Sequence, residues 1–193
     1  SMTFLLNALK SSNERPAAFS AIGQMAQALG HASVHATKQM GTHLTSISTL
    51  IRDVLVTKKG KKICVEAIEC VGALAQGLGH RWKPYCISLM DTIFQTGMSS
   101  QLVSALEKIA QSLPELLPDV RDRLLQKITQ ILYRKETQSR SQGAEPTCLA
   151  LRTLGIFDFG ETSLLEFVKS TVLSFLDDAI VNGRSCPLSR RRP

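Results

Sequence analysis

The sequence predicts an all-α fold, an α-solenoid of about nine helices stacked as antiparallel pairs. Three observations lead to this prediction. Hydrophobic residues make up 44% of the 193 residues and aromatic residues only 5%, so the core must be aliphatic, a composition that favours helices. Apolar residues recur at helical spacing along most of the chain. One helical segment also occurs several times, as it does in repeat proteins.

The recurring segment is a run of small and aliphatic residues, and three of its four copies contain a glycine. Its copies are residues 17–31, 66–80, 106–113 and 150–155. Gly23 of the first copy matches Gly72 of the second at an offset of 49 residues, and the fourth copy ends at Gly155. Intervals of this length in a helical sequence are typical of paired-helix repeats of the HEAT or armadillo type.

The first four predicted helices cover residues 3–10, 14–30, 36–56 and 62–79. Gly30 and Gly79 occupy the end positions where a helix favours a residue with positive φ. The helix at 36–56 carries one apolar stripe, formed by Met40, Leu44, Ile47, Ile51 and Val54. The helix at 62–79 carries two, Cys64/Ile68/Val71/Ala75/Leu78 and Ala67/Cys70/Leu74. A helix with two stripes is covered on two sides, as stacking requires.

The other five predicted helices cover residues 84–97, 100–113, 117–134, 146–157 and 162–177. Prolines, which the first turn of a helix tolerates, stand near four probable starts: Pro84, Pro114, Pro118 and Pro146. Two further apolar stripes are Val120/Leu124/Ile128/Ile131 and Leu164/Val168/Val172/Phe175. The polar segment 136–145 has no apolar period, so it is predicted to be an exposed loop.

The net charge of +7 gives little information about partners, because it is concentrated at one end of the chain. Four arginines lie in the last ten residues, and without them the excess falls to +3. Nucleic-acid binding through this tail is one alternative function, but the body lacks the basic face typical of such proteins. We therefore expect no nucleic-acid partner.

Five cysteines form neither a disulfide framework nor a zinc-site spacing. They are Cys64, Cys70, Cys86, Cys148 and Cys186. Their odd number and apolar surroundings predict free thiols in a reducing compartment, and hence a cytoplasmic location. No apolar run approaches the roughly 20 residues that span a bilayer, so no membrane insertion is expected.

Asp158-Phe159-Gly160 spells the magnesium-binding tripeptide of protein kinases. That chemistry also needs a glycine-rich loop, a strand lysine and an H-R-D loop. His80-Arg81-Trp82 is not H-R-D, and 33 residues follow Gly160. The tripeptide is interpreted as a turn between two helices. No residue is predicted to be catalytic or to bind a cofactor, and no small-molecule substrate is expected.

Three other groups resemble functional motifs. Lys59-Gly60-Lys61-Lys62 lacks the upstream glycine and the following Ser or Thr of a phosphate loop, so it is interpreted as a basic loop, or as a docking point for an acidic partner. His31 and His35 lack a third metal ligand, and His80 matches His31 in the repeat, which suggests a role in the turn. No metal site is predicted.

Trp82 and Tyr85 flank Pro84 at a helix entry. An aromatic pair in this position packs the turn, or alternatively anchors a binding partner. The packing role is the preferred interpretation.

Five segments, in this order, resemble the N-terminal HEAT solenoid of the target of rapamycin (TOR) kinases. They are Glu14–Gly23, Gly97–Leu106, Ile109–Glu115, Ala150–Phe159 and Ser163–Val168. The Ala-Leu-Arg-Thr-Leu-Gly run followed by Phe-Asp-Phe is the most distinctive of them. The resemblance covers about residues 2–178, so the sequence divides into a repeat segment, 1–178, and a basic tail, 179–193, that is not similar to the family and is expected to be disordered.

The resemblance implies a non-catalytic part of a very large serine/threonine protein kinase in growth and nutrient signalling. In that family the N-terminal solenoid is a scaffold that engages a raptor-type subunit and helps to build a dimeric complex. The kinases act in the cytoplasm and on lysosomal, vacuolar and other endomembrane surfaces. No catalytic residue of the family has a counterpart here.

Two alternatives remain at this point: a HEAT adaptor unrelated to these kinases, such as a transport or phosphatase scaffold, and a chain that itself transfers phosphate. Binding faces are not determined by the sequence, although the loops 58–62 and 136–145 are candidates. Solenoid ends expose apolar residues, here Leu5, Leu6, Phe175 and Leu176. The isolated chain is therefore predicted to self-associate.

Overall fold

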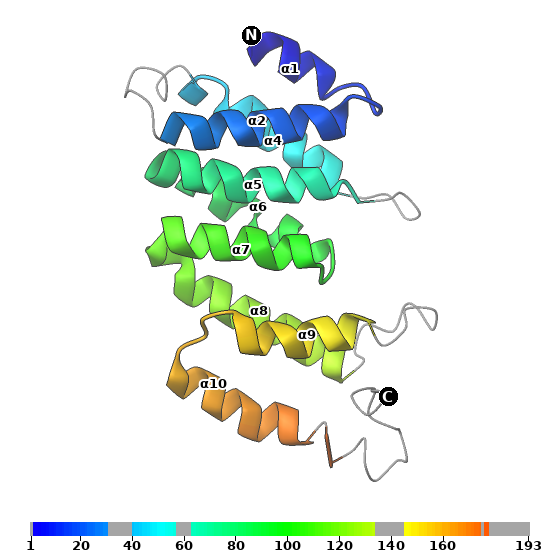
Figure 1. Ribbon diagram of the computed structural model, residues 1–193, viewed down its shortest axis with the longest axis vertical. Coiled ribbons are helices and arrows are strands. Elements are labelled where there is room, and N and C mark those ends of the chain that lie inside the picture. The colour runs from blue at the N-terminus through cyan, green and yellow to red at the C-terminus, as the bar shows by residue number, and fades with distance from the viewer. Residues whose placement is uncertain (1, 31–39, 57–62, 134–144, 175, 178–193) are drawn as a thin grey trace, which may run out of the picture. The chain divides into compact units, whose positions relative to one another are not determined.

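The computed structural model describes residues 2–30, 40–56, 63–133, 145–174 and 176–177. Every regular element in these ranges is helical, and nine of the elements are α-helices (Figure 1). The all-α prediction is therefore confirmed. The chain divides into two compact units, residues 1–120 and 121–193.

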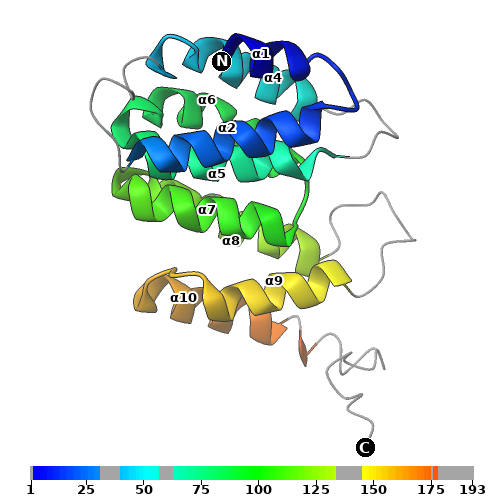
Figure 2. The ribbon, with the colours of Figure 1, turned by 45° about the horizontal axis from the view of Figure 1, so that its top comes forward.

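The first unit holds six α-helices and two short 3-10 helices. They are α1 (Met2–Ala8), α2 (Arg15–Gly30), α4 (Leu44–Leu55), α5 (Val65–Leu78), η1 (Gly79–Arg81), α6 (Lys83–Gln95), α7 (Ser100–Ser112) and η2 (Pro114–Leu116). Helices α2, α5 and α7 lie side by side in one layer (Figures 1 and 2). Helices α4 and α6 pack on each other and on α5, forming a second layer. This is the stacking of helix pairs that the repeats predict.

The core of the first unit is aliphatic, with two aromatic exceptions. Its fully buried large side chains include Leu9, Phe19, Ile22, Ile47, Ile51, Ile68, Leu74, Trp82, Leu89, Met90 and Ile93. Both stripes predicted for α5 are buried, and Cys64 alone among them is half-buried. Because each such side chain contributes about 1.5–3 kcal/mol when it leaves water, the interlayer packing is the main stabilising term.

The second unit contains the greater part of α8 (Leu117–Leu132), which begins at the end of the first unit, together with α9 (Glu145–Ile156), α10 (Glu161–Phe167) and the π-helical η3 (Val168–Val172). Leu124, Ile128 and Leu132 of α8 are buried, as are Ala150, Thr153, Phe157 and Phe159. The rings of Phe157 and Phe159 pack with their centroids 5.0 Å apart. In the stripe predicted for α8, Ile131 is half-buried and Leu132 takes its place.

The helix predicted at 36–56 is not continuous. Met40 and Gly41 are helical, Thr42 and His43 form a turn, and α4 begins at Leu44. Gly41 and Thr42 are weak helix formers, so the chain turns here while Met40 and Leu44 both stay buried. At the other end of α4, Leu55 takes the buried position predicted for Val54.

The predicted prolines and one predicted glycine lie where expected. Pro84, Pro118 and Pro146 are the second residues of their helices, and Pro114 opens η2. Gly79 has a φ of 52° directly after α5. The prediction of a positive φ at Gly30 is wrong, since positive φ occurs in the described residues at Gly79, Gly97 and Gly160.

The last predicted helix, 162–177, is helical throughout its described residues, but it contains a π-helical turn that was not predicted. Helix α10 ends at Phe167, η3 follows, and residues 173–174 and 176–177 are α-helical again. The wider turn shifts side chains around the helix axis, so Leu164, Val168 and Val172 are half-buried and do not form one buried stripe. Phe175, the fourth member of that stripe, lies outside the described residues.

Candidate protein-interaction surface

The repeated glycines bring the helices of the first layer into close contact. A Cβ on Gly23 of α2 would lie 3.2 Å from the Cβ of Ala73 on α5, and one on Gly72 of α5 would lie 2.9 Å from the Cα of Ala105 on α7. A Cβ on Gly77 would overlap the carbonyl group of Ala26. Gly23 and Gly72, which recur at the 49-residue offset, thus each lie where the next helix of the layer crosses.

Polar contacts supplement this packing, and one of them joins positions that the repeat makes equivalent. The Gln27 side-chain amide donates to Gln76 Oε1 at 2.9 Å, across the 49-residue offset. At the end of the layer, His80 Nδ1 and Lys83 Nζ lie 3.5 and 3.6 Å from the two carboxylate oxygens of Glu115. Because these groups are largely exposed, each pair contributes at most about 1 kcal/mol, and they act mainly by fixing the register of the stack.

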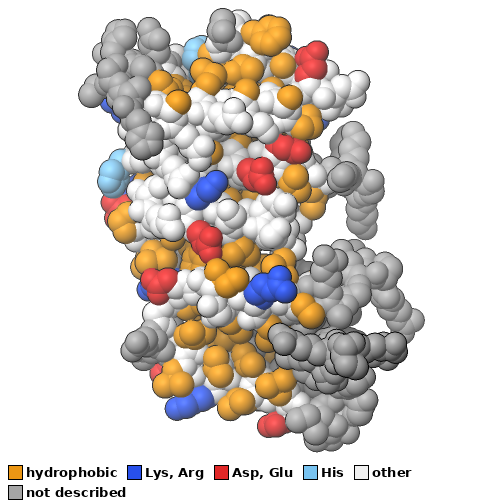
Figure 3. Space-filling view, viewed as in Figure 1, with side chains coloured by type: hydrophobic (Ala, Val, Ile, Leu, Met, Phe, Trp, Pro, Cys, Tyr) orange, Lys and Arg blue, Asp and Glu red, His pale blue; other side chains and the backbone are white. Residues whose placement is uncertain are grey.

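The outer surface of the first layer, here called the α2–α5–α7 face, is polar. Its exposed residues include Ser20, Gln24, Met25, Glu69, Gln76, Ser104 and Gln111. Met25 is the one large hydrophobic residue among them, and 38% of it is exposed. Figure 3 shows this side of the molecule, with charged side chains scattered over it.

The second layer presents a different surface, the α4–α6 face, formed by Thr45, Arg52, Tyr85, Ile87 and Ser88. The Thr45 and Tyr85 hydroxyls are 3.1 Å apart, and the Arg52 guanidinium donates to the Ser88 carbonyl oxygen at 3.2 Å. Ile87, which precedes Ser88 in α6, is 53% exposed. A tyrosine and an arginine held at the surface by hydrogen bonds are typical of protein-binding surfaces.

The two aromatic residues at the entry of α6 have separate roles. Trp82 and Tyr85 stack with their ring centroids 5.3 Å apart. Trp82 is fully buried, so its packing role is confirmed and it is not an anchor for a partner. Tyr85 is half-buried and its hydroxyl reaches the surface beside Thr45.

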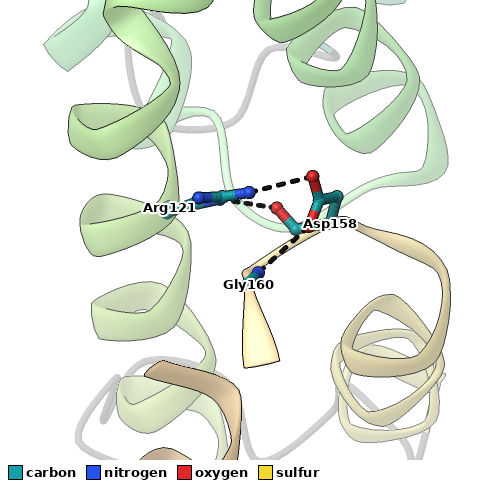
Figure 4. A network of polar contacts seen from close by, with 3 residues as sticks. All are labelled: Arg121, Asp158 and Gly160. Carbon is teal, nitrogen blue, oxygen red and sulfur yellow. Dashed lines mark hydrogen bonds and ion pairs between the residues drawn. The ribbon is translucent and has the colours of Figure 1, made fainter. Parts of the chain in front are cut away.

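The kinase-like tripeptide is a turn between α9 and α10 (Figure 4). Arg121 Nε donates to the Asp158 carbonyl oxygen at 2.7 Å, and its guanidinium lies 2.9 Å from the Asp158 carboxylate. The Gly160 amide donates to the same carboxylate at 3.0 Å, and the Gly160 backbone has a positive φ of 77°. Phe159 is buried. The tripeptide is thus a turn between two helices, as the sequence analysis predicts, and Asp158 holds it through these contacts.

The cysteines of the described ranges are free thiols. Burial raises the pKa of Cys70 strongly and that of Cys86 to about 12. Burial is also the largest cause of the raised pKa of Cys64. A thiol that stays protonated is a poor nucleophile and a poor metal ligand. Among the described residues no group of three His, Cys, Asp or Glu side chains could hold a metal ion.

Several candidates lie outside the described residues: His31, His35, the loop 58–62, positions 136–144 of the polar loop, Cys186 and the tail 179–193. His80 is described and lies in η1, where its contact with Glu115 gives it the expected role in the turn. No helix in the described ranges is both long and apolar enough to cross a membrane.

Sequence reasoning missed the polar partners of the helices. The repeat alignment pairs Gln27 with Gln76, and could have indicated their contact. Nothing in the sequence pairs Arg121 with Asp158, because the two lie 37 residues apart and in no repeat relation.

Comparison with known proteins finds relatives of one kind, serine/threonine-protein kinases of the TOR type. No protein-family model matches the chain. The chain is 34% identical over 197 residues to the serine/threonine-protein kinase TOR of Arabidopsis thaliana and 33% identical over 195 residues to that of Oryza sativa subsp. japonica, with 92% of this chain and 8% of each relative covered. It is 32% identical over 213 residues to the serine/threonine-protein kinase tor1 of Schizosaccharomyces pombe, with 96% of this chain and 9% of the relative covered.

The chain thus spans less than a tenth of the length of these relatives, and their activity as whole proteins is not carried over with the match. The similarity nevertheless extends over nearly all of this chain, and the described part of the chain has the all-helical repeat fold that the resemblance predicts. This chain corresponds to a segment of the TOR serine/threonine-protein kinases.

Proposed function

We propose that this chain is a non-catalytic interaction scaffold, part of the N-terminal HEAT solenoid of a TOR-type kinase, and that it binds a raptor-type subunit. The observation that carries the proposal is the match of nearly the whole chain to one short segment of these kinases. Stacked helix pairs offer extended rigid faces that suit protein binding.

The α4–α6 face is the binding surface in this proposal. Its side chains are held by the Thr45–Tyr85 and Arg52–Ser88 hydrogen bonds, so little conformational freedom is lost when a partner docks. Ile87 supplies exposed apolar area on the same helix, α6. The α2–α5–α7 face is more polar and serves as the reference surface.

Binding of the purified raptor-type subunit to the immobilised full chain tests the proposal. Ile87→Asp and Arg52→Glu should each weaken binding at least about tenfold, which is the effect of losing an interface hot spot. Ser104→Asp, a matched charge change on the α2–α5–α7 face, should leave the dissociation constant unchanged. If the unaltered chain does not bind, the scaffold role is wrong, and if all three variants bind equally well, the choice of face is wrong.

The absence of catalysis is also part of the proposal. Asp158 is paired with Arg121 and the Gly160 amide, which supports a structural role for it. The purified chain should neither bind ATP nor transfer phosphate from radiolabelled ATP to a generic protein substrate. Transfer that disappears in Asp158→Asn would contradict the proposal.

The proposed setting is the cytoplasm and the surfaces of endomembranes, within a dimeric kinase complex. Free thiols in the described ranges support a reducing compartment. Fractionation of cells, followed with an antibody to residues 15–133, should place the protein in the cytosolic and endomembrane fractions. Recovery from the secreted fraction would contradict this placement.

A further inference from the structure

A short motif, alanine and glutamine followed by a small residue and leucine, occurs three times in the first unit. Its copies are residues 26–29, 75–78 and 110–113, at the offsets of 49 and 35 residues that separate the repeat copies. Packing explains the alanines and leucines, since each is buried or half-buried in every copy. Burial does not explain the glutamines, because Gln76 and Gln111 are exposed and Gln27 is half-buried.

The three glutamines lie in one row across neighbouring helices. Helices α2, α5 and α7 lie side by side in one layer (Figures 1 and 2). The Gln27 side-chain amide donates to Gln76 Oε1 at 2.9 Å. Four residues further along, the equivalent His80 and Glu115 also meet, with His80 Nδ1 3.5 Å from Glu115 Oε1. Equivalent positions therefore face each other from α2 to α5 and from α5 to α7, and Gln27, Gln76 and Gln111 form what is here called the glutamine row.

The glutamine row has unused hydrogen-bonding capacity. A glutamine amide carries two N–H donors and an oxygen with two lone pairs. The bond between Gln27 and Gln76 uses one donor and one lone pair, so the Gln27 oxygen and the Gln76 amide nitrogen stay available. The Gln111 side chain has no hydrogen-bond partner in the part of the chain that the structure describes. The row can therefore both donate to a ligand and accept from it.

The spacing of the row matches a peptide backbone in the polyproline II conformation. Packed helices lie about 8–10 Å apart, and a polyproline II chain advances about 9.3 Å over three residues, which is one full turn. Every third residue therefore presents its backbone groups in the same direction, and these groups have no internal hydrogen bonds. In a β-strand the direction alternates with each residue, so the third residue would point away from the row.

We propose that Gln27, Gln76 and Gln111 bind an extended polypeptide segment in the polyproline II conformation, which crosses α2, α5 and α7 and is held by its backbone. Each glutamine accepts from the N–H and donates to the carbonyl oxygen of one residue in three. Contacted residues cannot be proline, because proline has no N–H, whereas the residues between them can be. The ligand is thus a proline-rich segment of about seven residues or more with a non-proline residue at every third position.

The experiment compares two synthetic peptides of equal length, one of repeated Ala-Pro-Pro and one of proline alone. Both favour the polyproline II conformation, but only the first has an N–H at every third residue. Each is titrated into the isotope-labelled full chain, and the side-chain amide signals of Gln27, Gln76 and Gln111 are followed by NMR. The Ala-Pro-Pro peptide should shift these signals saturably. Polyproline should bind at least about tenfold more weakly, because it lacks three hydrogen bonds that contribute severalfold each.

Substitutions in the row test which atoms bind. Gln76→Ala and Gln111→Ala should each weaken binding of the Ala-Pro-Pro peptide at least about threefold, and the chain should stay folded because alanine favours helix. Gln111→Glu keeps the shape and the acceptor oxygens but loses the N–H donors, so it should weaken binding as much. Gln95→Ala is the matched control, because Gln95 is an exposed glutamine of α6, outside this layer, and the dissociation constant should not change in it.

The peptide site is separate from the α4–α6 face, so Ile87→Asp should leave peptide binding unchanged. Four results would overturn the proposal. One is the absence of a saturable shift at about millimolar peptide. Another is equal binding of the two peptides, since the N–H groups would then not be recognised. The others are binding that persists when Gln76→Ala and Gln111→Ala are combined, and a loss in Ile87→Asp as large as that in Gln111→Ala.

Discussion

At the scale of single residues, small side chains decide how closely the helices approach. Gly77 has the tightest surroundings, because a Cβ there would overlap the Ala26 carbonyl group. A Cβ on Gly155, in contrast, would meet no described atom within 4 Å. Glycines in similar helices therefore differ in whether they tolerate replacement by a larger residue. The difference depends on whether another helix lies against them.

Gly77→Ala should lower the free energy of unfolding by about 1–3 kcal/mol, the usual cost of overpacking. Gly155→Ala should raise it by up to about 1 kcal/mol, because alanine is the better helix former and the site is open. Urea unfolding followed by far-UV circular dichroism measures both. Equal effects of the two substitutions would contradict the close contact between α2 and α5.

The buried thiols give a second prediction at this scale, a loss of stability in alkali. Burial raises the pKa of Cys86 to about 12 from an ordinary 9.0, so between these values the unfolded chain has lost a proton that the folded chain keeps. The contribution of this thiol to the free energy of unfolding is fully present below pH 9.0. Above that pH the free energy of unfolding falls, by up to about 1.4 kcal/mol per pH unit for each such thiol.

Urea unfolding across this pH window measures the slope. Cys86→Ala lowers the free energy of unfolding at every pH because it leaves a cavity. The free energy of unfolding of this variant should, however, fall less steeply with pH, by up to about 1.4 kcal/mol per pH unit, because one thiol proton no longer contributes. An identical slope in Cys86→Ala and the unaltered chain would show that the Cys86 thiol does not contribute.

At the scale of elements, connections are set by contacts that the local sequence does not contain. The turn between α9 and α10 depends on Arg121 of α8 and on a glycine with φ of 77°. The break before α4 depends on weak helix formers at Gly41 and Thr42. Helical periodicity predicts the existence of each element well, and its ends less well.

Asp158→Ala should destabilise the second unit by about 0.5–1.5 kcal/mol, because the Arg121 ion pair and the Gly160 hydrogen bond are lost near the surface. Gly160→Ala should cost about 1–3 kcal/mol, since a side chain strains this backbone conformation. Hydrogen exchange of α9 and α10 amides measures both effects locally. If exchange increases only in the first unit, the turn does not have this role.

At the scale of the whole molecule, apolar residues stay exposed at several helices. Phe4 is 71% exposed, Leu165 56% and Leu173 49%. Leu5 and Leu6, predicted to be the exposed residues of the first helix, are half-buried, and Phe4 takes that role. Exposed large hydrophobic residues of this kind commonly meet other protein surfaces.

The isolated chain should therefore self-associate. Sedimentation velocity over a concentration series should give a mean mass that rises above 21.1 kDa. Phe4→Ser and Leu165→Ser together should reduce the rise without loss of helical content. A constant mass of one chain at every concentration would refute the prediction.

The sequence alone determined the fold class, the positions of most helices, the repeat and the similarity to a TOR segment. These features depend on local backbone geometry: the 3.6-residue period, prolines in first turns and small residues at a fixed place in each copy. They can be recognised without knowing what any residue touches.

The tertiary structure decided which residues meet. It buried Trp82 and left Ile87 exposed, paired Arg121 with Asp158, and placed α7 against Gly72 but no described residue against Gly155. Each outcome depends on which element crosses a given helix, and the partners lie some 35 to 50 residues away in the chain. The sequence pattern shows which faces of a helix are apolar. Which helices lie against those faces is decided by tertiary packing.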